Sequence, residues 1–148
     1  MADHVRHQIR NQVVTQLTGL TTTGSNVYDS RIYPLEDGNL PAILIYTKSE
    51  VSEPLDIGSN RTLERVLSLN VEVYVKSTSS FEDTLDTICK EVEVAIAADP
   101  TLSGKAKDCH LESTEIEFNS EGEKPLAYAT LTFLTNYYVQ EQNPDVAV

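Results

Sequence analysis

The sequence has little of what nucleic-acid binding, disulfide scaffolds or membrane insertion require. Its 148 residues include 2 cysteines, and 11 lysines and arginines stand against 23 aspartates and glutamates, for a formal net charge of −12. Two cysteines cannot form a disulfide framework, so we expect Cys89 and Cys109 as thiols. Because affinity for a phosphate backbone comes largely from lysine and arginine, this balance disfavours a nucleic-acid-binding protein. No apolar run approaches the roughly 20 residues of a membrane span.

The length and the two ends predict a single domain that stays in the cytosol where it is made. Residues 1–8 lack the apolar stretch and the small-residue cleavage site of a signal peptide. A chain of this size buries roughly 68 to 70 % of its unfolded surface, which is enough for one core. We expect the domain to span residues 1–139. Residues 140–148 contain Pro144 and little apolar material, which predicts a loosely held tail.

Two segments have the apolar spacing of one-faced helices. From Asp3 to Leu20, apolar residues recur every four positions. The second helix is expected to follow Ser79, which forms a capping-box pattern with Glu82, and to end before Pro100. The expected buried residues are Val5, Ile9, Val13 and Leu17 in the first helix and Phe81, Leu85, Ile88, Val92, Ala95 and Ile96 in the second.

Five other segments have the composition of β-strands. They are residues 27–33, 41–47, 63–76, 108–118 and 126–139. Alternation is clearest in 63–76, where every second residue is apolar and is expected to face the core. The nearly continuous apolar run of 41–47 predicts a strand that is covered on both faces and lies in the centre of the sheet. In 126–139, Leu131 and Phe133 suit the core, whereas Tyr137 and Tyr138 suit a half-exposed sheet.

The connections complete the predicted topology. Residues 48–62 are polar and contain proline and glycine, so we predict a long loop that is either a contact element or a flexible hairpin tip. Residues 121–125 are typical of a hairpin connection, which makes the last two strands an antiparallel pair. The fold class is therefore α+β, in the order helix, three strands, helix, two strands. Both helices are expected to pack against a mixed or antiparallel sheet.

A search for reactive groups finds no established catalytic or metal-binding pattern. His4 and His7 lie beside Asp3 on the first helix, but they belong to no recognised zinc pattern, and His110 has only Cys109 next to it. The sequence contains no nucleophile elbow and no glycine-rich phosphate loop. Cys89 falls on the apolar face of the second helix, where a buried structural thiol is expected. We predict no catalytic residue, no metal, no cofactor and no enzymatic activity.

Three stretches, taken with this order of elements, resemble the tail terminator proteins of long-tailed bacteriophages, the minor tail protein U family. They are residues 9–17 (IRNQVVTQL), 27–34 (VYDSRIYP) and 40–47 (LPAILIYT). The resemblance implies a virion protein, made in the host cytoplasm, that stops growth of the tail tube by forming a hexameric ring on its end. It also implies a tube protein and a head-tail connector as partners, DNA only as passing cargo, and no membrane.

Charged residues are the candidates for the surfaces of such a ring. The expected contacts with a neighbouring subunit or the tube are Glu50, Glu53, Asp56, Arg61 and Arg65. Six copies would carry a net charge of about −72, and an acidic channel would let DNA slide without sticking. The expected channel-facing residues are Glu112, Glu115, Glu117, Glu121 and Glu123, for which an ordinary solvated strand is the alternative.

Three other functions compete with this interpretation. A different head-tail connector or tail-completion protein would have the same features. A cytosolic α+β module that binds a small ligand on its sheet would be a dimer with a pocket near Tyr46, Tyr74 or Tyr138. A small hydrolase would depend on Cys89 or His110.

Overall fold

The computed structural model describes residues 3–29, 40–76, 80–119 and 126–148. Its elements are α1 (Val5–Leu17), β1 (Val27–Tyr28), β2 (Ala42–Pro54), β3 (Thr62–Lys76), α2 (Phe81–Ala98), β4 (Asp108–Asn119) and β5 (Leu126–Gln140). This order confirms the predicted α+β class and the sequence of helix, three strands, helix and two strands. The expected connection at residues 121–125 and most of the strand expected at 27–33 lie outside the described residues.

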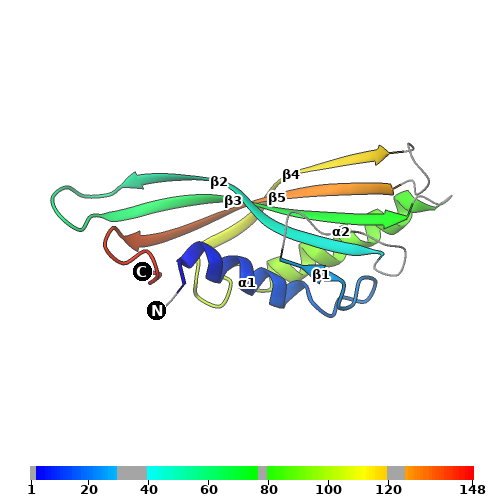
Figure 1. The fold of residues 1–148 in the computed structure, drawn as a ribbon, viewed down its shortest axis with the longest axis horizontal. Coiled ribbons are helices and arrows are strands. Elements are labelled where there is room, and N and C mark those ends of the chain that lie inside the picture. Colours follow the sequence, from blue (N-terminus) through cyan, green and yellow to red (C-terminus); the bar gives the residue numbers. More distant parts are fainter. Residues whose placement is uncertain (1–2, 30–39, 77–79, 120–125) are drawn as a thin grey trace.

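The strands form one mixed sheet in the order β1-β2-β3-β5-β4 (Figure 1). Short β1 pairs parallel with β2, and all other pairs are antiparallel, including the predicted pair of β4 and β5. The run expected to be a central strand falls in β2, which is an interior strand between β1 and β3, while β3 is the middle strand of the five. The run is buried on both faces, since residues 42–46 are all buried.

Both helices cover the same face of the sheet (Figure 1). The four predicted residues of α1 are completely buried, and α2 buries Leu85, Ile88, Cys89, Val92 and Ile96. They pack on the inward residues of β3 and β5, which alternate with partly exposed ones. The N-cap of α2 is Ser80, whose side chain makes no capping hydrogen bond, whereas the predicted cap Ser79 lies outside the described residues. We call the face opposite the helices the outer face.

The long loop predicted for residues 48–62 was wrong, because most of it is β-structure. After an irregularity between Thr47 and Ser49, β2 continues in register with β3 from Ser49, opposite Ser68, to Pro54, opposite Leu63. Only residues 55–61 connect the two strands, and Gly58 turns there with φ +109°. Residues 49–68 therefore form a hairpin arm that extends past the N-terminal end of α1 (Figure 1). The helices do not pack on this part of the two strands, so neither face has to be apolar. The resulting polar sequence resembles that of a loop.

The first turn of α1 packs against the segment that follows β5, at the side of the molecule from which the arm projects (Figure 1). The Val5 N–H donates to the Pro144 carbonyl at 2.9 Å, and the Val148 N–H donates to the Tyr138 carbonyl at 2.9 Å. Gln8 Nε2 adds a bond of 2.9 Å to the Asp145 carbonyl. The residues expected as a loosely held tail are thus tied to α1 and β5 by hydrogen bonds in this structure.

Candidate functional site

A cluster of charged side chains joins the base of the hairpin arm to α1. The Glu50 side chain, 10 % exposed, lies with its Oε1 at 3.0 Å from Arg6 Nη1 and 3.5 Å from Arg65 Nη1. Its Oε2 accepts a hydrogen bond of 2.5 Å from the hydroxyl of Tyr137 on β5. Tyr137 is 1 % exposed, so the half-exposed position predicted for it was wrong. Glu50 and Arg65, expected as contact residues, are thus engaged within the chain.

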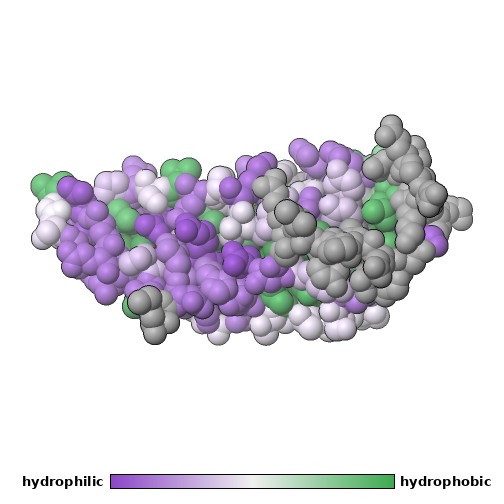
Figure 2. All heavy atoms as spheres, viewed as in Figure 1, coloured by the Kyte–Doolittle hydropathy of each residue, from purple (hydrophilic) through white to green (hydrophobic). Residues whose placement is uncertain are grey.

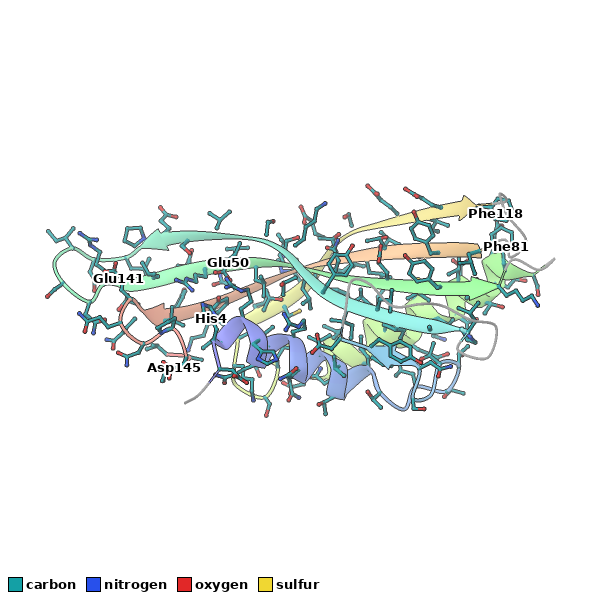
Figure 3. All side chains as sticks on the ribbon, viewed as in Figure 1. His4, Glu50, Phe81, Phe118, Glu141 and Asp145 are labelled. Atoms are coloured by element: carbon teal, nitrogen blue, oxygen red, sulfur yellow. The ribbon has the colours of Figure 1, made fainter. Side chains whose placement is uncertain are left out.

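His4 closes this cluster from the N-terminal end of α1, and Figure 3 shows it beside Glu50. Its Nδ1 accepts the Arg6 N–H at 3.0 Å as the helix N-cap, and its Nε2 lies 3.0 Å from Arg65 Nη1. Burial lowers the pKa of His4, and the positive charges of Arg6 and Arg65 lower it further, while Glu50 raises it. His4 is therefore held as a neutral ring whose two nitrogens face protein groups.

The lowered pKa of His4 predicts a stability that depends on pH. Because the unfolded chain binds a proton at His4 more readily than the folded one, the free energy of unfolding should fall as pH drops below about 6.5. His4→Asn keeps a capping oxygen but cannot be protonated. We expect urea unfolding between pH 7.5 and 5.5 to show a smaller loss of stability in His4→Asn than in the unchanged protein. Equal losses in the two proteins would contradict this role of His4.

The hairpin tip, residues 51–61, combines acidic side chains with exposed apolar ones. Val51, Leu55 and Ile57 are 69 %, 54 % and 94 % exposed, and Figure 2 shows apolar atoms at the far end of the arm. Asp56 Oδ1 accepts the Thr62 N–H at 3.0 Å. The sequence-based candidates in this segment were charged residues alone. Three bulky apolar residues within a polar stretch also indicate a contact surface, and this signal was missed.

The remaining contact candidates of the tip differ in whether they bind other residues of the chain. Glu53 is exposed, and no hydrogen bond or ion pair links it to another described residue. Arg61 is bound to Glu141, just beyond β5: its N–H donates to Oε1 at 2.7 Å, and its Nη1 lies 3.8 Å from Oε2. Figure 3 labels Glu141 near the end of the arm. Glu53 thus offers a charge to a partner, whereas Arg61 braces the arm against the end of β5.

An acidic band crosses the outer face of the sheet. In the register of the strands, Glu72 of β3 and Glu115 of β4 flank Thr130 of β5. Two residues further along β3, on the same face, the ring of Tyr74 stacks on the ring of Tyr128, with centroids 5.0 Å apart. We define the acidic band as Glu72, Glu115 and Glu117.

Tyrosine hydroxyls tie two members of the acidic band to the sheet. Tyr128 donates a hydrogen bond to Glu117, and this bond, more than burial, raises the pKa of Tyr128 to about 12. Tyr74 donates to Glu72 at 3.3 Å. Glu115 has no such tie to another described residue. Of the other expected channel residues, Glu112 is exposed where the β4 register shifts, and Glu121 and Glu123 lie outside the described residues.

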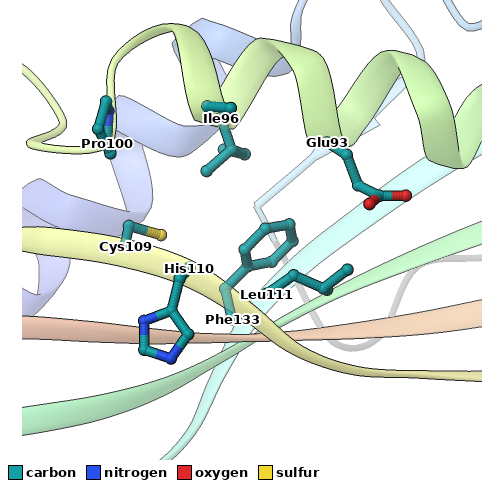
Figure 4. A pocket seen from close by; sticks show the side chains of 8 residues that line it. Glu93, Ile96, Pro100, Cys109, His110, Leu111 and Phe133 are labelled. Carbon is teal, nitrogen blue, oxygen red and sulfur yellow. The ribbon is translucent and has the colours of Figure 1, made fainter.

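The sites expected of the competing functions have other geometry. A cavity of about 340 Å³ lies between α2 and β4, with Cys109 and His110 in its lining (Figure 4). These two side chains project to opposite sides of β4, as neighbours on a strand do. Burial raises the pKa of both Cys89 and Cys109 to about 11, which keeps both as unreactive thiols at neutral pH.

The tyrosines of the expected ligand pocket bind groups of the chain itself. Tyr46 is 9 % exposed, and its hydroxyl accepts a bond of 3.3 Å from Asn70. Tyr138 donates to Glu64 at 3.0 Å, and Tyr74 stacks on Tyr128. Within the described ranges, no cluster of three or more histidine, cysteine or acidic side chains could hold a metal ion. None of the helices in these ranges could span a membrane.

The fold and these surfaces define a single α+β domain with a braced hairpin arm and an acidic outer face. Residues 4–137 match the model of a family described as phage minor tail protein U. The chain therefore belongs to the phage minor tail protein U family.

The chain is also similar to a protein of a solved virion structure. No curated protein matches the chain. One similar solved structure is a chain of the "Virion of native gene transfer agent (GTA) particle". It is 14 % identical, the match covers 90 % of both chains, and the TM-score is 0.39.

Proposed function

We propose that this protein is a structural component of the phage tail that caps the tail tube as a hexameric ring and presents the surface to which the head attaches. The observation that carries the proposal is the family match over residues 4–137. The protein would be made in the host cytoplasm and act in the virion. It would work by the shape of its contacts, with the tube protein and a head-tail connector as partners and without turning over any substrate.

The structure supports this role through the hairpin arm. The arm extends past the helices, while the Glu50 cluster at its base and the contact of Arg61 with Glu141 near its tip hold it in place. A ring repeats one heterologous contact, so each subunit must carry two different complementary surfaces. A braced projection is suited to be one of them. Contacts that are weak between free subunits would hold at the tube end, because the tube brings six subunits to a high effective concentration.

The mass of the protein with and without tubes tests this proposal. Light scattering at several concentrations should give mostly free subunits at low concentration and a mass of six subunits as concentration rises. After incubation with purified tail tubes and removal of unbound protein, six copies should remain per tube. A dimer whose mass does not change with concentration and which ignores tubes would contradict the proposal and favour a ligand-binding module.

We also propose that the acidic band, together with Glu112, faces the channel of the ring. Carboxylates that line a channel repel the phosphates of passing DNA and so keep the DNA from sticking. This proposal rests on the exposure of Glu112, Glu115 and Glu117 along one edge strand.

Reversing charge on β4 should slow DNA passage and leave the cap intact. The double variant Glu112→Lys and Glu115→Lys spares the bond of Glu117 with Tyr128. We expect normal ring mass, normal tube capping, and DNA release slowed several-fold at low salt, with partial recovery at high salt. The control is Asp86→Lys with Glu93→Lys, which makes the same change of net charge on the exposed side of α2. Equal release rates in the two double variants would refute the channel position of β4.

A further inference from the structure

We propose that the hairpin tip of each subunit docks in a groove on the helix layer of the next subunit. The helix groove has a volume of about 570 Å³. Its lining includes Gly19, Leu20, Thr21, Lys90, Val94 and Ala98. This inference rests on the proposed ring, to which it assigns the two surfaces of the repeated contact.

The hairpin tip has apolar side chains that its own chain leaves uncovered. Ile57 is 94 % exposed and Leu55 is 54 % exposed, at the end of an arm that extends beyond the helices. Side chains of this size gain most from burial in an apolar partner surface. The tip is also narrow, because only residues 55–61 join the two strands. Its shape is that of a projection that enters a groove.

The helix groove offers the matching apolar surface. Val94, in the C-terminal half of α2, is 61 % exposed, whereas Val92 and Ile96 on either side of it are buried. Gly19 and Leu20 form the opposite wall, in the turn that follows α1. Gly19 adopts φ +93° and adds no side chain to this wall. An exposed apolar strip of this kind marks a place where another chain can bind.

The charges of the two surfaces are complementary. Glu91 is turned toward its own chain, where it accepts hydrogen bonds from the Thr22 N–H at 3.0 Å and the Thr22 hydroxyl at 2.5 Å. Glu91 also lines the groove, but both of its carboxylate oxygens are engaged by Thr22. Lys90 is exposed and bound to no other described residue, so its positive charge is the one available to a partner. Glu53 and Asp56 bring negative charge to the hairpin tip. Complementary charges of this kind fix the register of a contact and disfavour wrong partners.

The positions of the two surfaces require a second copy. The arm extends past the N-terminal end of α1, whereas the turn that forms one wall of the helix groove follows the C-terminal end of α1 (Figure 1). A tip therefore cannot reach the groove of its own chain. A contact between two different surfaces of identical chains repeats from copy to copy, and it closes into a ring when the rotation per step allows it.

Two single substitutions and a matched control test the contact. Ile57→Glu and Val94→Glu should each weaken ring formation and tube capping by about tenfold or more, while Tm and circular dichroism stay as in the unchanged protein. Ile116→Glu is the control, since Ile116 is 56 % exposed on β4, outside both surfaces. It should leave ring formation and capping unchanged. A charge swap extends the test: Glu53→Lys and Lys90→Glu should each weaken the ring, and the two together should restore it.

Cross-linking then identifies which chain the hairpin tip touches. Ile57→Cys subunits mixed with Val94→Cys subunits on tail tubes, with oxidised glutathione added as the oxidant, should form a disulfide between positions 57 and 94 of different copies. The native thiols are 8 % and 4 % exposed and should stay out of the reaction.

Other results would separate failure of the tip contact from failure of the proposed function. Normal rings from Ile57→Glu that fail to bind tubes would show that the tip contacts the tube protein, which overturns the inference. Normal rings and normal capping by both Glu variants would overturn it while the proposed function stands. If the unchanged protein neither forms rings nor caps tubes, the proposed function and this inference fail together.

Discussion

Glu50→Ala is expected to lower the free energy of unfolding by about 2 to 4 kcal/mol. The substitution leaves Arg65, whose side chain is 16 % exposed, without its carboxylate, and it removes the acceptor of the Tyr137 hydroxyl. Arg6 is 40 % exposed, so water compensates for the loss on that side, and its share of the effect is small. Urea unfolding monitored by circular dichroism measures the change, with a fall in Tm of about 2 to 4 °C for each kcal/mol.

Two further variants separate the charge cluster from a general effect on the arm. Glu53→Ala, on the same strand but exposed, should change stability by less than about 0.5 kcal/mol. Adding Arg65→Ala to Glu50→Ala should recover part of the loss, because it removes a half-buried charge that has lost its carboxylate. Similar effects of Glu50→Ala and Glu53→Ala would show that the cluster contributes nothing special to stability.

Phe133→Ala should lower the free energy of unfolding by about 3 to 5 kcal/mol, as expected when a large core side chain is removed. Phe133 is 2 % exposed on the helix-covered face of β5. The adjacent Leu134 is partly exposed on the outer face, and Leu134→Ala should cost only about 1 kcal/mol. Chemical denaturation of the two variants measures both values. A cost for Leu134→Ala equal to that for Phe133→Ala would mean that the outer face is packed as tightly as the helix-covered one.

The elements that pack on the core could be predicted from their spacing. Residues four apart in α1 and two apart in β3 lie on one face, so Val5 to Leu17 and Leu67 to Val75 were assigned correctly. Tyr137 was misplaced although it has the same parity as Leu131 and Phe133. Counting in steps of two along β5 places it inward, and its hydroxyl is accommodated because it donates a hydrogen bond to Glu50.

The candidate site could not be predicted in the same way, because its contacts are distant in sequence. Glu50 meets Arg6 from 44 positions away and Tyr137 from 87 positions away. A list of charged residues cannot show which of them pair with each other and which stay available to a partner. The strand character of the arm was hidden as well, since alternation is imposed only where one face of a strand is buried.

The proposed contact between hairpin tip and helix groove gives the acidic outer face a separate role in the ring. Subunits would be joined through the arm and the helix layer, on the other side of the sheet from the acidic band. Charge reversal on β4 and substitution of Ile57 should therefore affect different steps, DNA passage in the first case and ring formation in the second. The two variants together should show both defects, each of about its own size, because the sites are far apart.

Negative-stain imaging of tail tubes grown from purified tube protein tests the central proposal most directly. With the unchanged protein present, tubes should stop growing, and averaged end views should show a ring with six-fold symmetry at one end. Tubes grown with Ile57→Glu should continue to lengthen and lack the ring. Tubes that lengthen equally with and without the unchanged protein, and that carry no added density at either end, would contradict the account.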